Sequence, residues 1–269
     1  MKPSVLITGA YGGMGKATAE ALAQRGFRVF ALDRTVGESG EDIIPVEADL
    51  TDENSVTAAY RQVREMTDSL YAIIHFAGIY MLDSLLEIEG EAFERIFKIN
   101  LGGAFLVNKT FLPLLGAGSR ILITTSELAP LDPLPFTGIY AVSKRALDTY
   151  AYSLRMELQL KQIEVSVLRA GAVDTGMLGV STAALERFHQ KTKLYTCNAE
   201  RFSLIVNKVE ARCISPETLA RKVIRILRKR RPKFAYAINR NPLLLLLHLL
   251  PQRMQFWVIR QVLKAPDRM

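Results

Sequence analysis

The sequence predicts an α/β fold, built as a doubly wound, mostly parallel sheet of seven strands with a C-terminal helical extension. Three observations support this prediction. Short apolar runs alternate with helical patterns, which is the rhythm of βαβ units and of a parallel sheet covered on both faces. The first run passes directly into a glycine-rich turn. The chain has 269 residues, 49% of them hydrophobic, which is enough for one large domain with a substantial core.

The first strand is expected at Ser4–Thr8, and a helical pattern follows at 16–25. The turn between them has the spacing G-x-x-x-G-x-G, which brings backbone N–H groups and a helix N-terminus to a pyrophosphate. A P-loop is excluded because Ala10 and Ala17 stand where it requires a glycine and a Ser or Thr. The position of the turn after the first strand therefore predicts a Rossmann-type dinucleotide site.

A second strand at 28–33 ends in a carboxylate, Asp33. An acidic residue there accepts hydrogen bonds from the adenine ribose hydroxyls and repels a 2′-phosphate, which favours NAD. Arg34 follows directly, and its guanidinium suits a 2′-phosphate, so NADP stays open as the alternative.

The third strand, at 43–50, closes in a polar turn from which Asp49 is expected to reach an adenine amino group. A helix capped by Asp52 follows to residue 66, and the fourth strand, at 70–78, exits through a glycine. A long helical pattern at 91–115 is interrupted at Asn100–Gly103, where each glycine costs about 1 kcal/mol relative to alanine. The interruption is either a kink whose freed carbonyl holds a water or a packing notch.

A fifth strand at 119–125 delivers Ser126 to the carboxyl edge of the sheet, where ligands of open α/β sheets bind. Thr125 is the alternative for the role of Ser126. Further along, Tyr140 and Lys144 are four residues apart and share one face of a helix. A free phenol has a pKa near ~10, and lowering it by about 3 units requires roughly 4 kcal/mol of differential stabilisation. The Lys144 ammonium and a positive nicotinamide ring are expected to supply this, which predicts Tyr140 as a general acid or base.

The sixth strand is expected at 163–169, and a segment of mixed helical pattern at 177–214 follows. We interpret this segment as a lid over an apolar substrate, the alternative being extra core helices. A short strand at 234–238 leads into the C-terminal segment.

Charge is unevenly distributed along the chain. The net charge is +8, but residues 218–269 carry 13 Lys or Arg and one acid, Asp267, which leaves −4 for residues 1–217. A basic end beside apolar segments indicates a membrane surface or an acidic partner rather than nucleic acid. The Leu-rich run between Pro242 and Pro251 is too short for a bilayer, which needs ~20 residues. It suits an interfacial helix or, alternatively, packing on the lid or across a dimer.

Cysteine and histidine usage indicates neither a metal site nor a disulfide framework. The two cysteines, Cys197 and Cys213, and the three histidines are far apart in the sequence. The apolar run at the N-terminus is too short for the core of a signal peptide. A cytoplasmic location is therefore expected.

From Ser4 to about Tyr236 the chain resembles a classical short-chain dehydrogenase/reductase. The resemblance is carried by T-G-x-x-x-G-x-G from Thr8, the Asp49–Leu50 pair, N-x-x-G from Asn100, the strand-end Ser126 and Y-x-x-x-K from Tyr140. It implies that Ser126 polarises the substrate oxygen and Tyr140 transfers the proton. It also implies that Lys144 binds the nicotinamide ribose and lowers the Tyr140 pKa, and that Asn100 holds a water linking Lys144 to solvent. The implied cofactor contacts are Gly9, Tyr11, Gly12, Gly13, Met14, Gly15, Asp33, Arg34, Asp49, Leu50, Ala77, Gly78, Tyr140, Lys144, Gly171, Val173 and Thr175.

Three features depart from the family pattern. The usual N-N-A-G after the fourth strand is His75-Phe-Ala-Gly78, and the usual P-G after the sixth is Ala170-Gly171. Ser126 also precedes Tyr140 by 14 residues, one more than is common, so we expect an insertion that reshapes the substrate mouth. The Leu-rich, basic C-terminus resembles those of hydroxysteroid and retinol dehydrogenases.

Together these features predict a domain over residues 1–238, with its lid at 177–214 and a helical extension at 239–269. The predicted activity is hydride exchange between NAD(H), or NADP(H), and a lipophilic secondary alcohol or ketone. The alternative from another class is a non-catalytic dinucleotide sensor or scaffold at a membrane surface. The family resemblance implies a homodimer or homotetramer, and the extension predicts peripheral membrane contact.

Overall fold

The computed structural model describes residues 2–264 except 211 and 212, and it omits the side chains of 176–182 and 207–210. The strands form one sheet in the order β3-β2-β1-β4-β5-β6-β7. Every pairing between these neighbours is parallel, so the described sheet is wholly rather than mostly parallel. Their bounds are β1 (Ser4–Thr8), β2 (Arg28–Asp33), β3 (Ile43–Glu47), β4 (Leu70–His75), β5 (Leu115–Ser126), β6 (Glu164–Ala170) and β7 (Ala235–Ile238).

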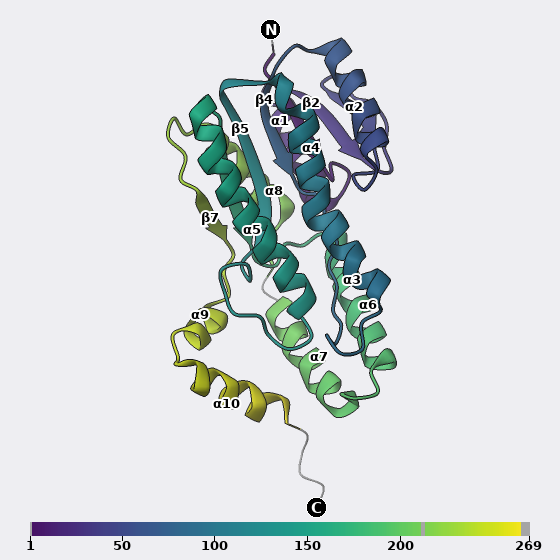
Figure 1. Ribbon diagram of the computed structural model, residues 1–269, viewed down its shortest axis with the longest axis vertical. Coiled ribbons are helices and arrows are strands. Elements are labelled where there is room, and N and C mark those ends of the chain that lie inside the picture. Colours follow the sequence, from purple (N-terminus) through teal and green to yellow (C-terminus); the bar gives the residue numbers. More distant parts are fainter. Residues whose placement is uncertain (1, 211–212, 265–269) are drawn as a thin grey trace, which may run out of the picture.

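Helices cover both faces of this sheet, which makes the fold doubly wound (Figure 1). One face packs against α1 (Gly13–Ala23) and α8 (Pro216–Leu227), where Leu22 and Val223 are fully buried. The other face packs against α2 (Glu53–Met66), α4 (Gly103–Phe111) and α5 (Gly138–Leu158), with Phe111 and Leu147 in its core. Asp52 caps α2 as predicted, because its carboxylate accepts the N–H groups of Asn54 and Ser55.

The long helical pattern after β4 is interrupted where predicted, but by a change of helix type. A π-helical turn, Lys98–Gly102, joins α3 (Gly90–Phe97) to α4, and a 3-10 turn, Leu112–Leu114, ends the run. Such π-turns inside α-helices are frequent at functional sites, and this one carries Asn100. A second 3-10 turn, Gln159–Lys161, follows α5.

The segment after β6 that was predicted as a lid forms two helices, α6 (Gly176–Lys191) and α7 (Thr196–Glu210). They pack into a small apolar cluster of their own that also includes Leu82 and Phe136 from the loops after β4 and β5. Phe136 contacts the rings of Phe188 and Phe202 with centroids 4.6 Å and 5.3 Å away. This segment is thus tied to the loops at the carboxyl edge of the sheet.

The C-terminal extension consists of α9 (Pro242–His248) and α10 (Gln252–Leu263), which lie at the carboxyl end of the sheet beside α7 (Figure 1). The strongly basic run Arg228–Lys233 lies before β7 and therefore at the opposite edge, so the basic C-terminus is divided between two ends of the molecule. Within the described chain, no helix is both long enough and apolar enough to cross a bilayer.

Candidate active site

Two adjoining cavities open at the carboxyl edge of the sheet. The larger, about 1290 Å³, extends from the β1–α1 turn across the ends of β2 and β4. The smaller, about 230 Å³, lies between the end of β5, α5 and α7. Their shared wall consists of Met14, Phe76, Gly78, Ile79, Tyr80 and Thr175. This arrangement suits a long ligand that meets a smaller one at a common boundary.

The glycine turn forms one end of the larger cavity. Gly9 has a φ of +67°, and the N–H of Gly12 donates to the Gly9 carbonyl at 3.2 Å, which tightens the turn. A Cβ on Gly15 would lie 2.0 Å from the same carbonyl oxygen, so no other residue fits there. The predicted contacts Gly9, Tyr11, Gly12, Gly13, Met14 and Gly15 all line this cavity. The cradle and the N-terminus of α1 fit a pyrophosphate.

Asp33 and Arg34 line the same cavity at the end of β2. The Asp33 carboxylate accepts the N–H of Tyr11 at 3.0 Å and that of Arg34 at 2.8 Å. These two bonds fix its orientation and leave acceptor sites, because an ionised carboxylate has about four. Asp33 can therefore also accept hydrogen bonds from ribose hydroxyls.

The remaining predicted contacts beyond β3 and β4 also lie in this wall: Asp49, Leu50, Ala77 and Gly78. Asp49 accepts hydrogen bonds from the N–H and the hydroxyl of Thr51, both at 2.8 Å, and these bonds lower the pKa of its carboxyl. The N–H of Ala77 donates to the Thr8 hydroxyl at 3.4 Å, which ties the loop after β4 to β1.

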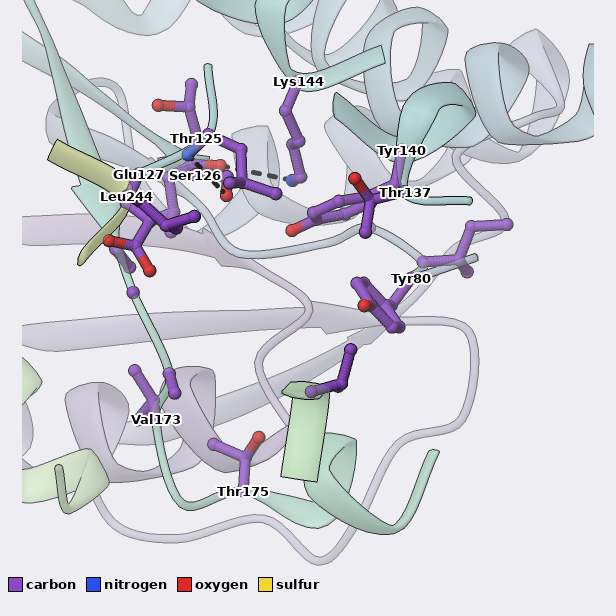
Figure 2. A pocket seen from close by; sticks show the side chains of 18 of the residues that line it. Tyr80, Thr125, Ser126, Glu127, Thr137, Tyr140, Lys144, Val173, Thr175 and Leu244 are labelled. Carbon is purple, nitrogen blue, oxygen red and sulfur yellow. Dashed lines mark hydrogen bonds between the residues drawn. The ribbon is translucent and has the colours of Figure 1, made fainter. Parts of the chain in front are cut away.

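Ser126, Tyr140 and Lys144 line the smaller cavity and lie near one another (Figure 2). The Ser126 hydroxyl accepts the Leu128 N–H at 3.2 Å, and it lies close enough to Tyr140 to lower the pKa of the phenol. The Lys144 ammonium donates to the Thr124 carbonyl at 3.4 Å and lies 5.9 Å from the centre of the Tyr140 ring. Thr125, the alternative to Ser126, instead donates its hydroxyl to Asp148 at 3.0 Å. The geometry thus pairs Tyr140 with Ser126.

Burial shifts the pKa values of Tyr140 and Lys144 so that the charged form of each side chain is disfavoured. It raises the pKa of Tyr140 to about 12, although the Ser126 hydroxyl opposes the shift. It lowers the pKa of Lys144 to about 8. In the protein alone the Tyr140 pKa therefore moves opposite to the expected direction, because desolvation of the phenolate outweighs the effect of Ser126.

Asn100 is buried beneath the site and clamps two segments. Its side-chain N–H₂ donates to the Ile79 carbonyl at 3.1 Å and to the Ser143 hydroxyl at 3.0 Å, while its oxygen accepts the Ile79 N–H at 2.7 Å. A Cβ on Gly78 would meet the Asn100 oxygen at 3.0 Å and the Lys144 nitrogen at 3.2 Å, which places these groups around one point. That Asn100 holds a water linking Lys144 to solvent stays a prediction.

The loop after β6 lies along the boundary of the two cavities. Gly171 and Val173 line the smaller cavity, and Thr175 lines both. A Cβ on Gly13 would lie 2.7 Å from the Thr175 Cβ, so this loop reaches the glycine turn. The predicted contacts from distant parts of the sequence are therefore brought to one surface.

Two residues of the smaller cavity escaped prediction, Glu127 and Tyr80 (Figure 2). Glu127 is buried, and its carboxylate accepts the N–H of Asn241 at 2.6 Å. Burial raises the pKa of its carboxyl, although the Asn241 N–H and Arg240 oppose this. Its place directly after Ser126 was an available signal. The Tyr80 ring packs against that of Tyr140 with centroids 4.8 Å apart, and nothing in the sequence indicated this contact.

In the described part of the chain, no three His, Cys, Asp or Glu side chains gather in a way that could hold a metal ion. The site is instead a glycine cradle beside a Ser–Tyr–Lys cluster. Fold and site together define a dinucleotide-binding α/β protein of the doubly wound class.

Comparison with known proteins identifies the family within this class. A family model described as short chain dehydrogenase matches residues 3–186. A versicolorin reductase of Emericella nidulans is 33% identical over 183 residues, which cover 64% of this chain and 69% of that protein. The chain therefore belongs to the short-chain dehydrogenase/reductase family and is an oxidoreductase.

Solved structures of the same fold hold nicotinamide cofactors. A 3-ketoacyl-(acyl-carrier-protein) reductase from Brucella melitensis complexed with NADH superposes with a TM-score of 0.71 and 21% identity, covering 88% of this chain and 96% of that one. A short chain dehydrogenase from Burkholderia cenocepacia in complex with NADP superposes with a TM-score of 0.73 and 21% identity, covering 98% of each chain. The glycine cradle of this chain has the form that suits the pyrophosphate of such a dinucleotide.

Proposed function

We propose that this oxidoreductase exchanges a hydride with a lipophilic secondary alcohol or ketone bound in the smaller cavity. The observation that carries the proposal is that Ser126, Tyr140 and Lys144 line one small cavity, which shares a wall with the cofactor-sized cavity. Family membership among oxidoreductases leaves the non-catalytic sensor without support.

In this proposal the bound nicotinamide supplies or accepts the hydride. For the reductive direction, Ser126 donates a hydrogen bond to the carbonyl oxygen, and Tyr140 gives that oxygen its proton as the C=O π bond opens and a C–H bond forms. Lys144 favours the phenolate left on Tyr140 and binds the nicotinamide ribose. Asn100 positions Lys144 by holding the loop after β4. The oxidative direction reverses each step.

The preference for a lipophilic substrate is supported by the lining of the smaller cavity. Beyond the reacting end, it is walled by Leu128, Leu134, Phe202, Ile205, Val206 and Leu244. Apolar walls with a few polar groups at one end favour a ligand with a single reactive oxygen on a largely hydrocarbon frame.

The role of Tyr140 is tested by Tyr140→Phe. We expect turnover of lipophilic secondary alcohols with NAD to fall by roughly 10²–10⁴-fold, because the variant lacks the transferable proton. Binding of NADH, followed by enhanced nicotinamide emission, is expected to remain. Tyr60→Phe is the matched control, since it removes a hydroxyl on α2 far from both cavities and keeps the ring contact with Phe111. Unchanged turnover in Tyr140→Phe would remove this residue from the mechanism.

We also propose NAD as the preferred cofactor. The support is Asp33, which the Tyr11 and Arg34 N–H groups hold in the wall of the larger cavity. A carboxylate there binds ribose hydroxyls and repels a 2′-phosphate. Fluorescence titration is expected to give tighter binding of NADH than of NADPH, and Asp33→Ala to reduce the difference. Tighter binding of NADPH by the wild-type chain would mean that Arg34 decides the choice.

A homodimer or homotetramer is part of the same proposal. Its support is a row of exposed apolar side chains on the outer faces of α4 and α5: Phe105, Val142, Tyr152 and Met156. Exposed apolar patches of this kind mark protein interfaces. A cytoplasmic location is supported by the two unpaired cysteines, Cys197 and Cys213, as found in reducing compartments.

A further inference from the structure

The outer face of the C-terminal extension exposes an unusual amount of apolar surface. On α9 the side chains of Leu243 and Leu246 are 64% and 59% exposed, and that of Leu249 at its C-cap is 80% exposed. On α10, Phe256 and Trp257 are 68% and 63% exposed. The Leu residues are three apart and thus share one side of their helix. Large apolar side chains gathered in this way mark an interaction surface.

Basic side chains flank this apolar surface. On α10, Arg253 and Arg260 stand one turn before and one turn after the Phe256–Trp257 pair, and Lys264 follows one turn later. All three are exposed, as is Arg240 before α9. Residues 218–264 contain no Asp or Glu, so the described part of the extension is purely basic in its charged side chains. A face with an aromatic centre and basic flanks has the composition of helices that lie in the plane of an anionic bilayer surface.

Hydrogen bonds hold the extension in place at both ends. The Asn241 N–H donates to Glu127, and His248 accepts the N–H of Asp132 in the proline-rich loop. The Asn198 side chain on α7 donates to the Leu263 carbonyl at 2.6 Å. The exposed face is therefore carried by an anchored element, and its apolar side chains stay in solvent although the opposite side of the extension contacts the protein.

The opposite side of α9 reaches the substrate cavity. Leu244 lines the smaller cavity (Figure 2). Its neighbour Leu243 is exposed. One short helix thus separates the cavity from the exposed apolar face. A surface that entered a bilayer here would bring the cavity close to the source of lipophilic molecules.

We propose that the outer face of α9 and α10 docks on an anionic phospholipid bilayer and sets the substrate cavity beside it. A second copy of the chain fits this face less well. A symmetric contact would bring Arg253 and Arg260 of both copies into one interface, and neither α9 nor α10 contains an Asp or Glu to offset them. Uptake of substrate from the bilayer rests on the proposed function, whereas docking does not.

Vesicle binding tests the proposal, and Trp257 is a convenient reporter because the chain contains one tryptophan. The full chain is mixed with vesicles of phosphatidylcholine containing about 30% phosphatidylserine, or with phosphatidylcholine alone, at roughly 0.15 M salt. We expect co-sedimentation and a blue shift of Trp257 emission with the anionic vesicles, and at least about tenfold weaker binding to the neutral ones.

Matched variants locate the surface. The double variant Leu249→Asp/Phe256→Asp is expected to lose binding by roughly tenfold or more, because charge replaces side chains that would enter the interface. Leu160→Asp is the control, since Leu160 is 85% exposed but lies after α5. It is expected to bind like the wild type. NADH binding, measured on the same samples, verifies that each variant is folded.

Three results would overturn the proposal. The first is the absence of binding to anionic vesicles. The second is an equal loss of vesicle binding in Leu160→Asp and in the double variant. The third is a Trp257 blue shift that appears without vesicles as the protein concentration rises, together with a doubling of the protein's mass in solution. The last would assign the face to a second copy. If docking succeeds but NADH does not bind, the proposed function fails and the docking surface stands.

Discussion

His75 replaces the first Asn of the family's usual N-N-A-G, and the structure shows what it does there. It is fully enclosed at the end of β4, where its Nε2 lies 2.9 Å from the Asn108 oxygen and its Nδ1 lies 3.4 Å from the Thr8 hydroxyl. Asn108 in turn donates to the Tyr150 hydroxyl at 3.2 Å. The ring thus connects β1 and β4 to α4 and α5 with both nitrogens near polar partners.

Burial lowers the pKa of His75 from 6.5 to about 4, and this makes stability depend on pH. Between these two values the unfolded chain binds a proton that the folded chain does not, so the free energy of unfolding falls as pH falls toward 4. His75→Asn is expected to remove about 2 kcal/mol of the loss between pH 7 and pH 5, as measured by urea denaturation at both values.

The control for this measurement is His189→Asn, because His189 is exposed on α6. The control is expected to retain the full difference between the two pH values, since carboxylates titrate equally in both variants. If His75→Asn retained that difference as well, the folded-state pKa of His75 would have to lie close to that of the unfolded chain.

At the residue scale, the site residues that local helix or strand patterns position were predicted, whereas contacts between segments far apart in the sequence were not. Tyr140 and Lys144 were found because helix geometry alone places them on one face. Ser126 and Asp33 were found because parallel strands end at one edge. Tyr80 reaches Tyr140 through a loop with no periodic pattern, and the shift of the Tyr140 pKa depends on burial by several distant elements. Neither effect has a local signature.

At the scale of the element, strands were easier to predict than the helices between them. β1, β2 and β7 lie within a residue of their expected positions, because short apolar runs bounded by turns have clear limits. β5 begins earlier than expected, at Leu115, which pairs with Leu70 before the register shifts between Leu70 and Ala72. A strand end of that kind depends on its neighbour and not on its own sequence.

The π-turn between α3 and α4 shows a different limit. Asn100, Gly102 and Gly103 correctly indicated an interruption, but helix type depends on where the surrounding segments pack. A Cβ on Gly103 would lie 3.0 Å from the Leu50 Cβ, which supports a close-packed notch here. The same turn directs the Asn100 side chain to Ile79 in the loop after β4. The π-turn therefore provides both the close packing at Gly103 and the position of Asn100 in the site.

At the scale of the whole molecule, the C-terminal extension contacts both α7 and the smaller cavity, for which the sequence offered several alternative roles. The sequence allows packing on the lid and contact with a membrane as alternative uses of the same segment, and in the structure the two sides of this segment differ in exposure. The inner side meets α7 and the smaller cavity, whereas the outer side is exposed. A sequence pattern cannot separate these sides when a helix is apolar most of the way round.

A variant that ends after Leu250 tests how far the order of α7 depends on its contacts with the C-terminal extension. The larger cavity is lined only by residues up to Arg187, so NADH binding is expected to be unchanged. α7 loses the bonds from Asn198 and Arg201 to the carbonyls of Leu263 and Lys264, together with the packing of Leu263 on the apolar cluster of α6 and α7.

We therefore expect amide hydrogen exchange in α7 to accelerate in the shortened chain, because fewer buried contacts oppose local opening. Exchange in α1, which packs on α8 at a distance from the extension, serves as the internal reference and is expected to stay the same. Asn198→Ala in the full chain removes one of the two bonds and should give a smaller acceleration confined to α7. If the amide hydrogens of α7 exchanged at equal rates in all three proteins, the order of α7 would depend on the contacts of Phe136 with its aromatic neighbours and not on the extension.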